Sequence, residues 1–136
     1  MQDRPSAIEL LDAVRGFLEK DVVGALDGTA KFHARVAANV LAILARELAL
    51  EPAQLGAEWQ RLDAVLGAAP MPAADALRDA VRVRTEALCA RIRAGDADSG
   101  PFRTATLDHV RATVREKLAI ANPRQLAASP TAEGSQ

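Results

Sequence analysis

The run KFHARVAANVLAILARELAL at residues 31–50 constrains the fold of this chain more than any other segment. It is long enough for about five turns of α-helix. When it is wound as a helix, apolar side chains occupy more than half of its circumference. A helix on the surface of a globular domain would instead present a wide polar face. We therefore expect this segment to be the central, largely buried helix of a small helical domain.

The same run has nearly the length of a membrane span, but its polar residues argue against that role. It contains Arg35, Arg46 and Glu47 in addition to His33 and Asn39, and charged side chains are costly in the middle of a bilayer. The N-terminus has no basic region followed by an apolar run, so it does not resemble a signal peptide. The sequence therefore predicts a cytoplasmic protein without a membrane span.

Composition points to helices and excludes several classes of partner. The chain has 136 residues, with 17 basic and 18 acidic side chains, and this balance argues against nucleic-acid binding. Alanine is the commonest residue, tyrosine is absent, and runs of β-branched and aromatic residues are missing, which favours helices over strands. The single cysteine, Cys89, excludes an intramolecular disulfide and leaves a cysteine-based zinc site without most of its ligands. We expect no cofactor and no metal.

Start and stop signals divide the chain into about five helices. Ser6 and Glu9 have the spacing of a capping box, Pro52 suits the first position of a helix, and Gly95 and Pro123 are typical of helix ends. The predicted helices cover residues 6–22, 29–50, 52–66, 73–94 and 104–121. The fold class is therefore all-α: a single-domain bundle over residues 1–124, with a central, largely buried second helix and a flexible C-terminal tail over residues 125–136.

The motifs of several enzyme classes are missing. The sequence has no GxGxxG or GxxxxGK segment to bind phosphates and no HExxH metal motif. None of its serines lies in a nucleophile-elbow context. These absences weigh against a self-contained enzyme, and no catalytic residue is predicted.

The polar residues inside the run at residues 31–50 are the first candidates for a site. His33 could act as a general base or contact a ligand, because histidine titrates near neutral pH; alternatively, it is a core histidine with a hydrogen-bond partner. Arg35, Asn39 and Arg46 share one narrow line of the predicted helix. They could bind an anionic ligand, or instead form ion pairs and a buried amide contact between helices.

Later in the chain, the candidates are weaker. Arg84 and Arg91 lie seven residues apart on the predicted helix 73–94, where they could clamp an anion, although cations that extend to solvent along an apolar surface are the plainer interpretation. Cys89 is interpreted as a small apolar residue beside the core. His109 lies opposite the predicted apolar stripe of the last helix, so we expect it to be exposed. That stripe consists of Leu107, Val110, Val114 and Leu118.

Two segments together resemble a known family. They are RPSAIELLDAVRGFLEKDV with KFHARVAANVLAILAREL, within residues 4–48, and LDHVRATVREKLAIANPR at residues 107–124; the block FHARVAANVL is the most specific part. They resemble an uncharacterised bacterial family of small helical domains of unknown function. Its members tend to be encoded beside, or fused to, aminoglycoside-phosphotransferase-like kinases and acyl-CoA dehydrogenases. The resemblance implies a partnership with one of these enzymes and supplies no catalytic residue.

Three classes of function remain open. The first is a non-catalytic accessory or protein-interaction module that works with such a kinase or acyl-CoA dehydrogenase. The second is a small-molecule binder for an anionic ligand, with a site between helices near His33, Arg35 and Asn39. The third is an enzyme of unknown class at the same place. Assembly into a homo-oligomer is compatible with each of them.

Overall fold

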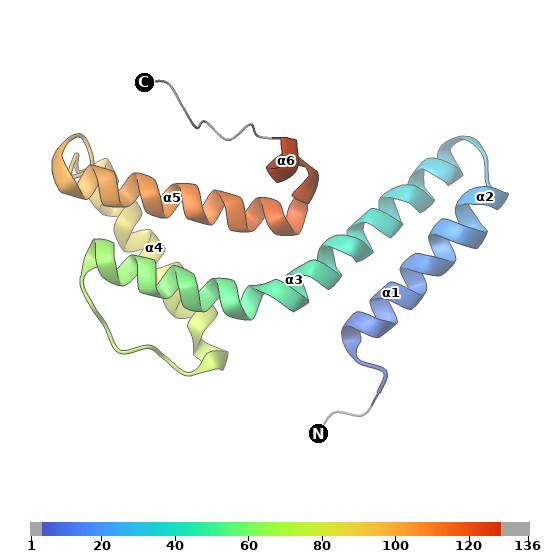
Figure 1. The fold of residues 1–136 in the computed structure, drawn as a ribbon, viewed down its shortest axis with the longest axis horizontal. Coiled ribbons are helices and arrows are strands. Elements are labelled where there is room, and N and C mark those ends of the chain that lie inside the picture. The colour runs from blue at the N-terminus through green and yellow to red at the C-terminus, as the bar shows by residue number, and fades with distance from the viewer. Residues whose placement is uncertain (1–3, 129–136) are drawn as a thin grey trace. The chain divides into compact units, whose positions relative to one another are not determined.

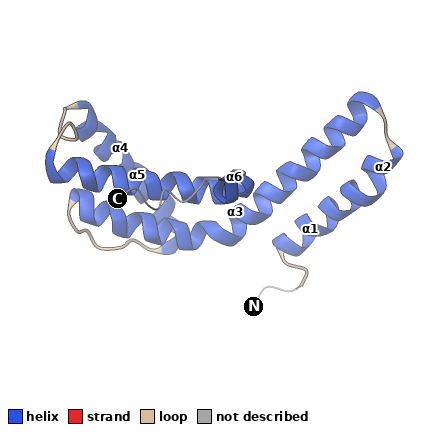
Figure 2. Ribbon diagram, turned by 45° about the horizontal axis from the view of Figure 1, so that its top comes forward, coloured by secondary structure: helices blue, strands red, loops and turns tan. Residues whose placement is uncertain are grey.

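The structure, a computed structural model, describes residues 4–128, and all regular secondary structure in this range is helical (Figures 1 and 2). The predicted all-α fold with about five helices is therefore confirmed. The contacts within the chain form two compact units, residues 1–50 and residues 51–136, which are described separately below.

The first unit is a helical hairpin. One arm consists of α1 (Ala7–Phe17), the π-helical turn η1 (Leu18–Val22) and the short α2 (Val23–Ala25). The other arm is the first part of α3 (Gly28–Leu66), which lies beside α1 in both views (Figures 1 and 2). The predicted capping box is present: the Glu9 amide donates to Ser6 Oγ at 3.3 Å, and the Ser6 amide donates to Glu9 Oε2 at 2.7 Å.

The first part of α3 is not the buried helix that its sequence predicts. Its buried side chains are three alanines, Ala34, Ala38 and Ala45, which allow close approach of another helix because they are small. Leu41 and Ile43 are partly buried, but five of its large apolar side chains are 42–62% exposed: Phe32, Val36, Val40, Leu44 and Leu48. The expectation of a largely buried second helix is therefore wrong for this segment, because each helix of a two-helix hairpin has only one neighbour within the unit to cover it.

The chain continues as a helix through Pro52, where the sequence predicts that a new helix begins. Pro52 lies inside α3, and its ring nitrogen has no hydrogen to donate to a carbonyl of the preceding turn. The boundary between the two units, at residues 50 and 51, falls at this interruption of the hydrogen-bond ladder.

The second unit contains the remaining part of α3, α4 (Ala74–Arg93), α5 (Gly100–Ala121) and the short α6 (Pro123–Ala128). Its core brings together side chains from α3 and α4, with Leu55, Leu66 and Phe102 packed against them. The buried members are Trp59, Leu62, Val65, Leu77, Val81 and Leu88. The core of this unit therefore comes mainly from the two segments, residues 52–66 and 73–94, that the sequence predicts as helices.

The ends of the later helices agree with the sequence signals in part. Gly95 follows α4 with φ +92°, in the left-handed region that favours glycine, and its amide donates to the Ile92 carbonyl at 3.1 Å. α5 begins at Gly100, four residues before its predicted start, with Pro101 in its first turn. Residues 125–128 of the predicted tail belong to α6, and residues 129–136 lie outside the described residues.

Among the described helices, none is both long enough and apolar enough to cross a membrane.

Candidate functional site

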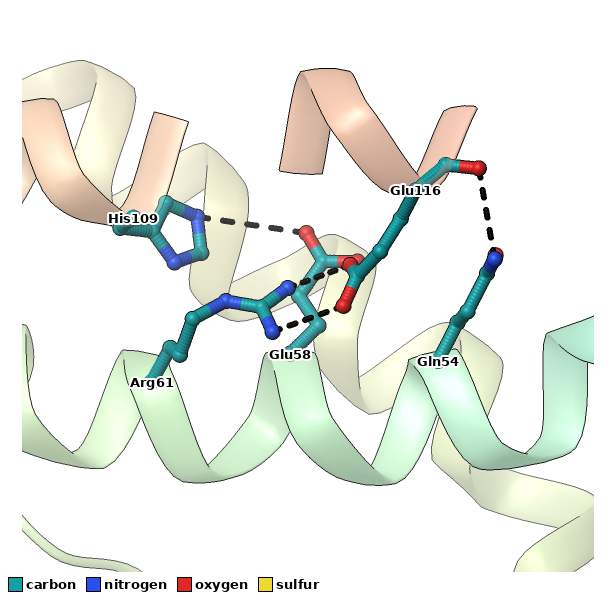
Figure 3. A network of polar contacts seen from close by, with 5 residues as sticks. All are labelled: Gln54, Glu58, Arg61, His109 and Glu116. Atoms are coloured by element: carbon teal, nitrogen blue, oxygen red, sulfur yellow. Dashed lines mark hydrogen bonds and ion pairs between the residues drawn. The ribbon is translucent and has the colours of Figure 1, made fainter. Parts of the chain in front are cut away.

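The side of α5 that packs into the second unit carries polar residues beside the apolar Phe102 and Ala105. Thr106 and His109 are each only 5% exposed, whereas Val110 and Val114, on the adjacent apolar stripe, are 42% and 49% exposed. The prediction that His109 is exposed and lies opposite a buried apolar stripe is therefore wrong. The physical reason lies on α3, which presents complementary charged side chains, Glu58 and Arg61 among them, to this face of α5 (Figure 3).

An ion pair between Arg61 and Glu116 joins α3 to α5 (Figure 3). Arg61 Nη1 donates to Glu116 Oε1 at 2.8 Å and Nη2 donates to Oε2 at 2.5 Å, so the contact is bidentate. The two side chains are 24% and 23% exposed. Gln54 Nε2 adds a hydrogen bond to the Glu116 carbonyl at 3.3 Å. Paired, partly dehydrated charges of this kind hold two helices in a defined register.

His109 and Glu58 form a second polar pair beside the first. His109 Nε2 lies 4.0 Å from Glu58 Oε1, a separation longer than a hydrogen bond. Burial lowers the pKa of the His109 imidazole, and the positive charge of Arg61 lowers it further, while Glu116 opposes this change. Burial also raises the pKa of the Glu58 carboxyl, against the opposing effects of Arg61 and Lys117. Both shifts favour the neutral form of each group.

A pocket of about 220 Å³ opens beside this pair, between α3, α4 and α5. Its lining is mainly apolar and includes Leu88, Ile92, Val110 and Val114. Its polar lining comes from both members of the pair and from a few neighbours: Glu58, Thr85, Cys89, His109, Thr113 and Lys117. An apolar pocket with a few convergent polar groups is the usual form of a small-molecule site.

The polar residues predicted from the run at residues 31–50 do not line this pocket. His33, Arg35 and Asn39 are exposed, and Arg46 is partly buried. The His33 ring makes an edge contact with Phe32 at 5.6 Å between centroids. None of these residues lines the pocket of 220 Å³ or the more open depression beside Trp59. A ligand site near His33, Arg35 and Asn39 therefore stays a prediction.

The two arginines predicted on α4 have partners within the second unit. Arg84 forms an ion pair with Asp63, donates to the Leu62 and Gly67 carbonyls at 3.1 and 2.5 Å, and lies 4.6 Å above the Trp59 ring. Such contacts tie the end of α3 to α4.

Arg91 is held in a similar way near the end of α4. Its Nε donates to Asp96 Oδ2 at 2.7 Å, and its guanidinium lies 4.0 Å above the Phe102 ring. The Arg84 side chain is only 13% exposed, so it does not extend to solvent as the plainer interpretation expects, and an anion clamp formed by the two arginines stays a prediction.

Sequence reasoning missed the polar face of α5, although a signal for it exists. Thr106, His109, Thr113 and Glu116 recur at intervals of three and four residues, which places them on one side of a helix. The neighbouring apolar set has the same periodicity, and hydrophobicity alone favours that set for burial. Among the described residues, no group of three or more histidine, cysteine, aspartate or glutamate side chains could hold a metal ion.

The chain belongs to a protein family described as a domain of unknown function, DUF6285, which matches residues 24–125. The match includes the central segment between the two sequence blocks that carry the resemblance, and it spans parts of both units. No curated protein matches the chain significantly. No solved structure matches it significantly either.

Proposed function

We propose that this DUF6285 protein is a non-catalytic accessory module that binds a partner protein through the apolar face of its helical hairpin. The observation that carries the proposal is the exposure of Phe32, Val36, Val40, Leu44 and Leu48. These five residues are spaced four apart, so they follow one side of α3 over an arc of about 160°. Leu10, Val14 and Phe17 of α1 are exposed as well.

A continuous apolar surface of this kind is characteristic of a docking site. Single exposed apolar residues are normal on proteins, but contiguous patches mark places where another protein or a ligand binds. Helices with anchors at regular helical spacing bind partners by packing against apolar helices or grooves. The hairpin supplies such anchors on a preformed helix.

The family resemblance supplies the candidates for the partner. An aminoglycoside-phosphotransferase-like kinase or an acyl-CoA dehydrogenase of a bacterial cytoplasm is the proposed partner. The missing catalytic motifs support a role without its own reaction. The alternative of an anionic ligand near His33, Arg35 and Asn39 is less favoured, because these side chains are exposed and line neither pocket described above.

The test is binding of the purified full-length chain to the kinase or dehydrogenase encoded beside it. Val40→Lys places a charge within the apolar face. Asn39→Lys is the matched control, since Asn39 is also exposed and points about 100° away around the same helix. We expect the wild type and Asn39→Lys to bind alike and Val40→Lys to bind at least tenfold more weakly. Equal binding of the two variants, or no binding by the wild type, would contradict the proposal.

A further inference from the structure

The pocket beside His109 and Glu58 lies wholly within the second unit and uses none of the hairpin's apolar face. It is therefore independent of the proposed docking function. Its apolar wall comes from two helices: Leu88 and Ile92 from α4, and Val110 and Val114 from α5. Leu88 is almost completely buried, whereas the other three are exposed, so the pocket has a closed side and an open rim.

Two polar atoms near the pocket lack a partner. His109 Nδ1 and Thr113 Oγ1 are buried, and neither makes a hydrogen bond. Both residues line the pocket, and their spacing of four places them on the same side of α5. The His109 side chain is 4% exposed. Buried polar groups without a partner are uncommon and costly, so a ligand that satisfies them would gain from doing so.

The charge of the nearby Glu58 influences which nitrogen of His109 carries the proton. A carboxylate near Nε2 favours the tautomer that carries its proton on Nε2, and Nδ1 is then an acceptor. Thr113 Oγ1 can either donate or accept. A hydroxyl group of a ligand can donate a hydrogen bond to His109 Nδ1 and accept one from Thr113 Oγ1, so it would satisfy both atoms.

The charge and the volume of the pocket restrict the class of possible ligands further. The charged groups that line the pocket are Glu58 and Lys117, one of each sign, and the balance favours a neutral ligand over an anion or a cation. An apolar cavity of about 150 Å³ can hold benzene. The volume of about 220 Å³ therefore accommodates a ring of that size with a substituent.

We propose that this pocket binds a small neutral molecule with an apolar body, about as large as a substituted benzene, and one hydroxyl group that is hydrogen-bonded by His109 and Thr113. Phenols and cyclic alcohols belong to this chemical class.

The chain provides its own reporter for the test. Cys89 is the only cysteine in the sequence and lines the pocket. A bound ligand should slow the alkylation of Cys89 by iodoacetamide in proportion to occupancy, and chemical shifts of α4 and α5 amides should give the dissociation constant. The probes are p-cresol and toluene, which differ by one hydroxyl.

We expect p-cresol to bind the full-length protein and to protect Cys89. Toluene should bind about fivefold to tenfold more weakly, the equivalent of one hydrogen bond. Thr113→Val keeps the shape of the side chain and removes its hydroxyl. It should therefore weaken the binding of p-cresol and leave the binding of toluene unchanged. The control, Thr104→Val, makes the same change at an exposed position of α5 and should alter neither.

The comparison of the two probes on the wild type needs no variant and is decisive by itself. Toluene is the more hydrophobic probe, so it would bind at least as tightly as p-cresol if nothing in the pocket recognised the hydroxyl. That result, or no protection of Cys89 by p-cresol at saturating concentration, would overturn the proposal.

Discussion

Replacing Arg61 by methionine should destabilise the second unit by about 2–3 kcal/mol, more than the replacement of its partner Glu116 by glutamine. Breaking a fully buried ion pair costs about 3–5 kcal/mol, whereas an exposed pair contributes about 0–1 kcal/mol. The Arg61 and Glu116 side chains are 24% and 23% exposed, and their contact is bidentate. We therefore expect a loss of unfolding free energy between the values for an exposed and a fully buried pair.

The neighbours of the ion pair explain why Arg61→Met should lose more stability than Glu116→Gln. In Arg61→Met, the carboxylates of Glu58 and Glu116 lose the cation between them, and each raises the other's free energy. In Glu116→Gln, Arg61 still has Glu58 nearby, and the amide can accept one of the two hydrogen bonds, so we expect a loss of about 1–2 kcal/mol. The electrostatic effects of Arg61 and Glu116 on the Glu58 pKa have opposite signs, which supports this ordering.

Urea denaturation followed by fluorescence of Trp59 measures these losses, because Trp59 is the only tryptophan and is buried in the same unit. Arg111→Met is the matched control. Its pair with Asp108 is on the surface, with side chains 69% and 68% exposed, and the change should cost less than about 0.5 kcal/mol. Equal losses for Arg61→Met and Arg111→Met, or a larger loss for Glu116→Gln than for Arg61→Met, would refute the reasoning.

Three further predictions concern other parts of the chain. Glu58→Gln should raise the free energy of unfolding at pH 7, because burial disfavours the ionised carboxyl and raises its pKa in the folded state. The wild type regains this stability as the pH falls through the raised pKa towards 4.5, so the advantage of the variant should vanish in acid. His109 has a lowered pKa, so the wild type should lose stability as pH falls below 6.5, and His109→Gln should remove that loss in pH-dependent urea titrations. Asn39→Leu should leave the urea midpoint almost unchanged, because Asn39 is exposed; a cost of about 1–3 kcal/mol would instead show a stranded buried partner.

The sequence predicts the second unit better than the first, for a physical reason. In α4 the residues Leu77, Val81 and Leu88 recur on one side of the helix, while most charged residues, with the exception of Arg84 and Arg91, occupy the other, so a single face is suited to burial. The end of this helix is equally well defined, since Gly95 provides the left-handed conformation that the turn requires. Local signals of this kind need no knowledge of tertiary contacts.

The candidate site could not be predicted in this way. On α5 two faces have helical periodicity, and the choice between them depends on what α3 places opposite. Arg61 pairs with Glu116, and Glu58 lies beside His109, so the polar face is stabilised in the interior. Neither contact is visible in the sequence of α5 alone, since the partners are more than 50 residues away along the chain.

The incorrect prediction that residues 31–50 are largely buried has a different origin. Its periodicity correctly shows a wide apolar arc, but periodicity reports which side of a helix avoids water and not what covers that side. The most buried side chains of the first unit are alanines such as Ala34 and Ala38, each of which buries far less surface than a leucine, at roughly 0.8 kcal/mol for each CH₂ group. A hairpin that leaves Val40 and Leu44 exposed while burying alanines forgoes most of the hydrophobic stabilisation that its composition could provide. The largest gain in free energy available to this unit therefore comes from a surface that covers the apolar arc. This argument from stability leads to the same face as the proposed docking function, and it predicts that a partner bound to this face would raise the stability of the hairpin.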